Sequence, residues 1–270
     1  FAPRILLCAD TDLVAVVMKR CEKLFKDIKL NSKVEKIEKS QTDSYIVTIE
    51  HDGKIYQEEF DQVLMAVGRH PNTQNLELQK AQVKYDPKTL LIEVDSKCLT
   101  TNPNVYAIGD VIEGPALAHK ASKEGKVAAE VICGKPAEFD NVAIPAVVFT
   151  DPEISWVGLT EIEAKEKGIP IKVGRFPLSA LGRARTMGEK AGFVKVISDP
   201  ESGLIKGVGI VAPKASELIA EGSLAIEMGA TLEDLLATIH PHPTLSEAIV
   251  EAAEVAADHP VHLSRPKTQK

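Results

Sequence analysis

Several features that would point to other classes of protein are missing from this sequence of 270 residues. Its aromatic residues are few, with seven Phe, four Tyr and one Trp, and 39 acidic residues outnumber 32 basic ones, giving a formal charge of −7. A nucleic-acid partner needs a basic surface and stacking side chains, so none is expected. No apolar run approaches the roughly 18 residues that cross a bilayer, and no signal peptide opens the chain, so no membrane partner is expected either.

The cysteines also lack a functional pattern. Cys8, Cys21, Cys98 and Cys133 do not have the spacing of a metal site or of a C-x-x-C redox pair. Reduced structural thiols are typical of a reducing compartment, such as a bacterial cytoplasm or a mitochondrial matrix, and we expect the chain there. The first residue is Phe1 rather than Met, which suggests a processed or truncated polypeptide.

The composition, with 44% apolar and 26% charged residues, is typical of a globular protein. At about 150 residues per domain, the length predicts roughly two domains. The hydrophobic pattern indicates three segments, 1–68, 69–140 and 141–270. The first of these resembles the end of a domain whose beginning is absent.

The first two segments predict α/β structure. In residues 1–68, apolar side chains recur at helical spacing over 13–25, with Asp10 or Thr11 as the N-cap. Strands are expected at 44–50, 54–56 and 61–67, the last nearly all apolar and therefore buried on both faces. In residues 69–140 we expect strands at 91–94 and 105–108, and then a helix over 116–133.

The third segment has strands first and helices last, the order of an α+β domain with helices on one face of a mainly antiparallel sheet. Its expected strands are 146–149, 154–157, 172–177, 192–198 and 205–211. Its expected helices are 161–167, 216–228, 232–236 and 245–257. The predicted fold is thus an α/β portion followed by an α+β domain.

The most informative motif is His240-Pro-His-Pro-Thr-Leu-Ser-Glu247. Its prolines hold the preceding histidines in extended backbone, so both imidazoles project from a rigid turn. Glu247 either only caps the next helix, from the capping-box position after Thr244, or orients His242 as a general base. Zinc binding by the two histidines is a third, weak alternative, because no further Cys, Asp or His stands at ligand spacing; no metal site is expected.

A second motif runs from Thr101 to Asp110 and ends in Gly-Asp after an apolar stretch. A carboxylate at the carboxyl edge of a sheet can accept hydrogen bonds from the hydroxyls of a polyol chain. The helix that starts near Ala116 would offer its amino end to an anion. The alternative is an ordinary Gly-Asp turn.

Two further patterns have ordinary explanations. Gly207-Val-Gly-Ile-Val-Ala212 matches a dinucleotide fingerprint, but it lies in an expected strand, and Pro213 follows where a helix should begin. Arg183 and Arg185 are expected in a solvated loop.

Several stretches along the chain resemble the flavoprotein disulfide reductases, and most closely those that oxidise dihydrolipoyl groups. They are residues 1–6, 66–72, 106–110, 116–120, 149–153, 156–161 and 240–247. The last three residues of the 240–247 motif, Leu245-Ser246-Glu247, are similar to those of these members rather than to those of the glutathione or mercuric reductases. The latter remain the alternative within the family.

This resemblance implies a reaction and a set of site residues. Protein-bound dihydrolipoyl groups would be oxidised, with electrons passing through an enzyme disulfide and FAD to NAD. The acid/base would be His242, oriented by Glu247. Contacts to FAD are implied for Asp110, Ala116, Leu117, Ala118 and His119, and contacts to NAD for Val34 and Gly68.

The resemblance also implies domains and partners. Residues 1–68 would end an NAD-binding domain, 69–140 would form a central domain that contacts FAD, and 141–270 would form the interface of a homodimer. Implied partners are the lipoyl domains of a 2-oxoacid dehydrogenase or glycine cleavage complex. The family's nucleotide fingerprints and redox cysteine pair are missing here. We therefore expect the C-terminal half of such an enzyme, inactive alone, with a non-catalytic dimerisation fragment as the alternative.

Overall fold

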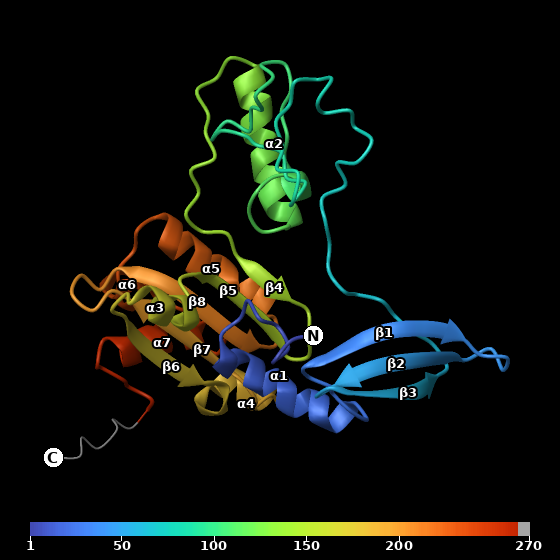
Figure 1. Cartoon of the computed structure of the whole chain (residues 1–270). Coiled ribbons are helices and arrows are strands. Elements are labelled where there is room, and N and C mark those ends of the chain that lie inside the picture. The colour runs from blue at the N-terminus through green and yellow to red at the C-terminus, as the bar shows by residue number, and fades with distance from the viewer. Residues whose placement is uncertain (264–270) are drawn as a thin grey trace. The chain divides into compact units, whose positions relative to one another are not determined.

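The computed structural model describes residues 1–263, which form two compact units (Figure 1). The first unit comprises Phe1–Val63 and the chain from Val142 onward, and the second comprises Leu64–Asn141. Residues from the first and third predicted segments thus share one unit, and the three-part division stays a prediction. Within residues 1–263, no helix combines the length and hydrophobicity needed to cross a bilayer.

A five-stranded antiparallel sheet forms the centre of the first unit. Its strands are β4 (Ala146–Val148), β5 (Glu153–Gly158), β6 (Lys172–Pro177), β7 (Phe193–Ser198) and β8 (Ile205–Ala212). They lie in the order β4-β5-β8-β7-β6, and every neighbouring pair is antiparallel. The predicted antiparallel sheet is confirmed, including the hairpin between β7 and β8.

Two helices pack on one face of this sheet. α5 (Ala215–Glu227) lies against β5 and β8, and α7 (Glu247–Ala256) lies against β6 and β7. The side chains buried between them include Val194, Val196, Val208, Ile210, Ile219 and Ile249. Burial of each such aliphatic side chain contributes about 1.5–3 kcal/mol, so this core holds α5 and α7 firmly in place.

The opposite face of the sheet is covered by α1 (Thr11–Leu24), the expected first helix. Its Leu13 and Val17 are buried against Ile154 of β5 and Val211 of β8. Because side chains alternate along a strand, Val211 faces α1 while its neighbour Ile210 faces α5 and α7. The sequence predicted helices on one face only, since nothing local links α1 to strands so far along the chain.

Close approach of neighbouring groups explains the two glycines in β8. A Cβ at Gly207 would lie 2.0 Å from the carbonyl oxygen of Leu159. A Cβ at Gly209 would lie 2.9 Å from the side chain of Lys195 and 3.1 Å from that of Leu13. The expectation that this Gly-x-Gly is part of a strand is confirmed.

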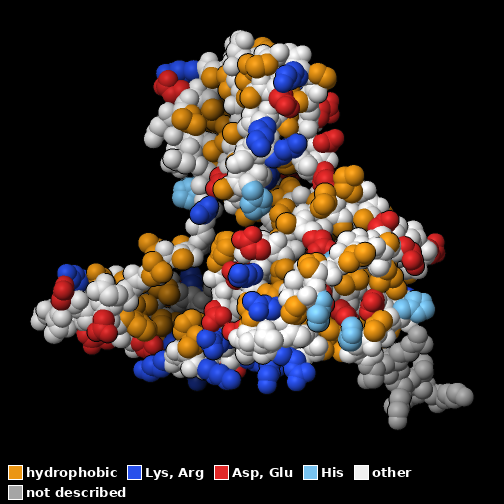
Figure 2. Space-filling view, turned by 180° about the vertical axis from the view of Figure 1, so that it is seen from behind, with side chains coloured by type: hydrophobic (Ala, Val, Ile, Leu, Met, Phe, Trp, Pro, Cys, Tyr) orange, Lys and Arg blue, Asp and Glu red, His pale blue; other side chains and the backbone are white. Residues whose placement is uncertain are grey.

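A three-stranded antiparallel sheet completes the first unit, formed by β1 (Ser32–Lys39), β2 (Tyr45–His51) and β3 (Lys54–Phe60). The predicted hairpin between β2 and β3 is confirmed, with Asp52 and Gly53 at positive φ. β1 was not predicted, because its alternating Lys and Glu residues hide the strand pattern. Apolar side chains remain on the surface of this sheet (Figure 2). Among them, Ile55 is 68% exposed.

The second unit contains one long helix, α2 (Ala118–Ile132), as expected over 116–133. Three short helices were not predicted: η1 (Gly109–Val111) in this unit, and η2 (Leu178–Ala180) and α4 (Gly182–Thr186) in the first. Arg183 and Arg185, expected in a loop, are exposed on α4. The strands predicted at 91–94 and 105–108 are wrong, because Ile92 and Tyr106 form only isolated bridges.

The strand predicted over residues 61–67 is also wrong. This segment makes no sheet pairing, and Leu64 and Val67 are 93% and 90% exposed. An all-apolar run becomes a buried strand only when neighbouring strands and covering helices surround it. Residues 1–263 do not supply them.

Candidate functional site

The His-Pro-His-Pro motif forms the turn between α6 (Leu232–Ala237) and α7. The N-cap of α7 is Ser246 rather than the predicted Thr244. The Thr244 hydroxyl instead donates a hydrogen bond to the carbonyl oxygen of Pro241, at 2.7 Å, which closes the turn on itself. The turn is therefore structured before the helix begins.

His242 and Glu247 are in direct contact within this turn. The Nδ1 atom of His242 lies 2.8 Å from Oε1 of Glu247. The second carboxylate oxygen, Oε2, accepts the backbone N–H of Thr244 at 2.7 Å. One carboxylate thus holds both the backbone of the turn and the ring of its histidine, so the two interpretations of Glu247 are not exclusive.

The electrostatics keep Glu247 charged. Burial raises the pKa of its carboxyl, but hydrogen bonds from Thr244 and His242 and the charge of His240 lower it more, so the net pKa lies below the usual value. The carboxylate favours the tautomer of His242 that carries its proton on Nδ1. The side chain of His242 is 76% exposed, which leaves Nε2 as the basic atom of an accessible ring.

His240 belongs to a second pair that the sequence did not reveal. Its Nε2 atom lies 2.6 Å from Oε1 of Glu221, on α5. Histidines and acidic side chains lie next to each other on the surface of this unit (Figure 2). The zinc interpretation gains no support, because neither histidine belongs to a potential metal-binding group among residues 1–263.

The acidic group that does resemble a metal site consists of Asp10, Asp12 and Glu161. The ammonium of Lys195 lies 2.7 Å from each of these carboxylates and takes the place that a cation would need. Asp10 also accepts the backbone N–H groups of Glu161 and Ile162, both at 3.0 Å. Asp10 is the N-cap residue of α1, as predicted, but its side chain does not cap that helix; it binds the amino end of α3 (Glu161–Lys167), whose own N-cap is Thr160.

In the second unit, Asp110 lies in the tight turn η1, with Oδ2 at 3.4 Å from a guanidinium nitrogen of Arg69. The N–H of Gly109 donates to Oε2 of Glu124 at 2.8 Å. Glu124 is buried together with Lys120, whose ammonium lies 2.5 Å from Oε1. The sequence missed this buried pair, although its i,i+4 spacing on a predicted helix was visible.

The other predicted cofactor contacts are divided between the units. Ala116 and Leu117 precede α2, and Ala118 and His119 begin it; no side chain caps this amino end in the described structure. Val34 lies in β1 of the first unit, whereas Gly68 lies in the second.

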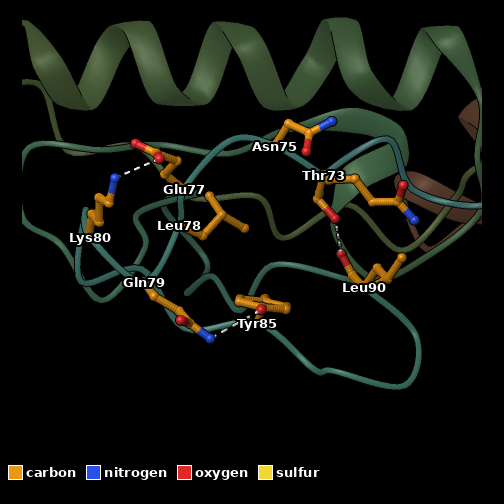
Figure 3. Close-up of a pocket in the computed structure, with 9 residues that line it drawn as sticks. Thr73, Asn75, Glu77, Leu78, Gln79, Lys80, Tyr85 and Leu90 are labelled. Atoms are coloured by element: carbon orange, nitrogen blue, oxygen red, sulfur yellow. Dashed lines mark hydrogen bonds and ion pairs between the residues drawn. The ribbon is translucent and has the colours of Figure 1, made fainter.

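A hollow of about 380 Å³ in the second unit contains none of the predicted site residues. Several of its polar side chains are paired with neighbours that also line it (Figure 3). Thr73 donates to the carbonyl oxygen of Leu90 at 2.9 Å, and Lys80 lies 2.6 Å from Glu77. The hollow therefore offers few polar groups to a ligand.

Comparison with protein-family models matches nearly the whole chain. Residues 1–125 match the model described as pyridine nucleotide-disulphide oxidoreductase. Residues 144–253 match the model of the dimerisation domain of the pyridine nucleotide-disulphide oxidoreductases.

Curated relatives and solved structures agree with these matches. The dihydrolipoyl dehydrogenase of Geobacillus stearothermophilus is 46% identical over 262 residues, which is 97% of this chain and 55% of the relative. That of Halobacterium salinarum is 50% identical over 251 residues, which is 93% of this chain and 53% of the relative. The chain thus spans about half the length of the curated relatives it matches.

Two solved structures are similar to the chain. LpdA from Mycobacterium tuberculosis has a TM-score of 0.85 and 28% identity, and the match covers 94% of this chain and 54% of that one. The HOCl-induced flavoprotein disulfide reductase RclA from Escherichia coli has a TM-score of 0.83 and 27% identity, with coverage of 95% and 57%.

Proposed function

Because the chain belongs to the pyridine nucleotide-disulphide oxidoreductase family, we propose that it supplies the acid/base and dimer-forming part of a dihydrolipoyl dehydrogenase. Such an enzyme oxidises protein-bound dihydrolipoyl groups to lipoyl groups, and electrons pass through a disulfide and FAD to NAD. The observation that supports this role best is the pairing of His242 with Glu247 in an exposed, rigid turn.

The proposed task of His242 is to take a proton from a substrate thiol. The thiolate is the form that attacks a disulfide, and a thiol near pKa 8.5 is mostly protonated at neutral pH. Nε2 accepts the proton while Nδ1–H remains bonded to Glu247, whose charge stabilises the resulting imidazolium. A positioned general base of this kind typically accelerates a step by about 10²–10⁴-fold.

The second unit offers residues that fit FAD. The carboxylate of Asp110 is half exposed and could accept hydrogen bonds from a polyol chain. Its turn packs closely on α2, where a Cβ on Gly109 would lie 3.2 Å from Ala121. Residues 116–119 would present the amino end of α2 to the flavin pyrimidine. FAD, when bound, relays electrons between the disulfide and NAD, and Val34 and Gly68 would contact NAD.

We also propose the division into an NAD-binding part (1–68), a central part (69–140) and an interface part (141–270). The match of residues 144–253 to a dimerisation domain supports a homodimer. Lipoyl domains of a 2-oxoacid dehydrogenase or glycine cleavage complex are the proposed partners, in a bacterial cytoplasm or mitochondrial matrix. The 270 residues contain no redox-spaced cysteines, and we expect no lipoamide activity from them alone.

Replacing His242 in the protein at its full encoded length tests this function. His242→Gln should slow the reaction with dihydrolipoamide by at least about 10²-fold, because the general base is lost. It should spare dye reduction by NADH, which needs no thiol deprotonation. His262→Gln is a matched control, since this exposed histidine pairs with another glutamate of α7, and it should change neither rate.

Two outcomes would contradict the proposal. An unchanged dithiol reaction in the His242→Gln protein would remove the acid/base role. Faster turnover of glutathione disulfide than of the lipoamide pair would assign the protein to a different disulfide reductase.

A further inference from the structure

The turn that carries His242 is tied to the fold at two places. Glu247 of α7 holds the ring of His242 and the backbone of Thr244. Two residues before His242, the side chain of His240 reaches Glu221 of α5. The two histidines of one short turn are thus bound by carboxylates from two different helices, and the core of the unit fixes both helices.

The partners of His240 determine its charge. Its Nε2 atom lies 2.6 Å from Oε1 of Glu221, and its Nδ1 atom lies 3.0 Å from the carbonyl oxygen of Thr238. A carboxylate and a carbonyl can only accept hydrogen bonds, whereas a neutral imidazole has one N–H to donate. Both contacts are favourable only when the ring carries two protons, so the arrangement is that of an imidazolium next to a carboxylate.

Burial makes this pair different from the one at His242. The side chain of His240 is 6% exposed and that of His242 is 76% exposed. A buried charge that loses its partner is costly, so the contact between His240 and Glu221 resists displacement. The ring of His242 has little packing of its own and depends on the backbone that carries it.

Pro241 connects the two histidines and makes the coupling stiff. Its ring fixes φ, and it restricts the residue before it to extended backbone. The carbonyl oxygen of Pro241 accepts the hydroxyl of Thr244, which closes the turn. A displacement of His240 is therefore transmitted to His242 rather than absorbed by a flexible link.

We infer that His240 is a positioning residue: as an imidazolium paired with Glu221, it anchors the turn to α5 and keeps His242 in contact with Glu247. This inference rests on the proposed acid/base function of His242. It adds Glu221 and His240 to the residues on which that function depends, although neither need touch the substrate.

The charge of His240 can be tested in the unaltered 270-residue chain. Nitrogen-15 NMR should find protons on both ring nitrogens of His240, one directed at Glu221 and one at the carbonyl oxygen of Thr238. His242 should show the tautomer protonated on Nδ1. An unprotonated nitrogen in the ring of His240 would overturn the inference.

Variants of Glu221 test the positioning role. Glu221→Leu removes charge and acceptor, Glu221→Gln keeps an acceptor, and Glu217→Gln changes an exposed residue one turn earlier on α5 as the control. Glu221→Leu should mix the tautomers of His242, alter the pH profile and slow the dithiol reaction at full encoded length on the order of tenfold. Glu221→Gln should restore part of the rate, and Glu217→Gln should match the unaltered protein.

The same measurements separate this inference from the proposed function. An unchanged His242 spectrum and pH profile in Glu221→Leu would overturn the positioning role, even where His242→Gln abolishes the dithiol reaction. No effect of His242→Gln would overturn the proposed function itself. If Glu221→Leu does not fold, Glu221→Gln decides the question, because loss of the second proton on His240 and a changed His242 spectrum are expected there too.

Discussion

The ammonium of Lys195 lies 2.7 Å from a carboxylate oxygen of Asp10, and both side chains are buried where α1 meets the five-stranded sheet. Asp12 and Glu161 lie at the same distance from this ammonium. One buried cation thus connects the start of α1, the start of α3 and strand β7. Its removal would leave the buried carboxylate of Asp10 without a cation, and Asp12 and Glu161 with Arg175 alone, which costs far more than the loss of a surface pair.

Lys195→Met keeps the aliphatic stem and removes the charge. We expect it to lower the free energy of unfolding by about 3–5 kcal/mol, because it leaves uncompensated buried charge. Urea denaturation followed by circular dichroism measures the change. Lys190→Met, at an exposed position, is the control and should shift stability by no more than about 0.5 kcal/mol. Equal midpoints for the two variants would show that the buried ammonium is not a stabilising group.

The same cluster should make the chain sensitive to acid. Burial raises the pKa of Asp12, but Lys195 and Arg175 lower it more, so the net pKa lies below the usual value. The folded chain therefore binds this proton less tightly than the unfolded chain, and the contribution of Asp12 is complete above about pH 4 and is lost as the pH falls further.

Asp12→Asn tests this dependence. The variant should be less stable than the unaltered chain at neutral pH and should lose less stability on acidification below about pH 4, since it has no carboxyl to protonate. Thermal unfolding at a series of pH values gives both curves. Two parallel curves would mean that Asp12 does not contribute to acid unfolding.

A third histidine pair lies further along α7. His262 Nδ1 is 2.5 Å from Oε1 of Glu251, and this hydrogen bond raises the pKa of His262. Burial raises the pKa of Glu251. A histidine with a raised pKa contributes fully below its usual value near 6.5, and its contribution is lost as the pH rises through the folded value.

Proton NMR should accordingly place the titration midpoint of His262 above about 6.5, and Glu251→Gln should return it to that value. A midpoint that does not respond to Glu251→Gln would show that the pair does not form in solution.

Replacing glycine by alanine should have opposite effects on stability at two positions, Gly207 and Gly182. At Gly207 a Cβ would lie 2.0 Å from the backbone oxygen of Leu159, so Gly207→Ala must displace the backbone just after β5 and should cost about 2–3 kcal/mol. At Gly182 the nearest atom would be 3.9 Å away, so Gly182→Ala should be neutral or stabilise by up to about 1 kcal/mol. Thermal unfolding compares them, and similar midpoints would contradict the close packing described for β8.

Local patterns were sufficient to predict most of the first unit. The strand over 172–177 and the helix over 161–167 have the predicted bounds. Each has local signals: the strand its apolar residues, and the helix a capping box at its start and a glycine at its end. The contact of His242 with Glu247 was foreseeable for the same reason, since the two residues are five positions apart with Pro243 between them.

Features that depend on distant residues were not predicted. Asp10 is the N-cap residue of α1, as its position predicted, but its carboxylate binds the amino end of α3, about 150 residues away. Glu221 and His240 are 19 residues apart in different elements, and no periodicity connects them. Over 61–67 the error was to predict a strand that does not form. The pattern of a buried strand does not reveal whether other strands are present to pair with it.

The packing of α1 on the sheet also has a consequence for biosynthesis. Leu13 contacts a cluster completed by Val211, which is translated roughly 200 residues later, a delay of about 10–40 s at 5–20 residues per second. Until then the apolar side of this helix has no native cover on the ribosome. The nascent chain therefore passes through a stage in which the apolar side of its first helix lacks its native contacts, and the first unit can complete its core only after β8 has been made.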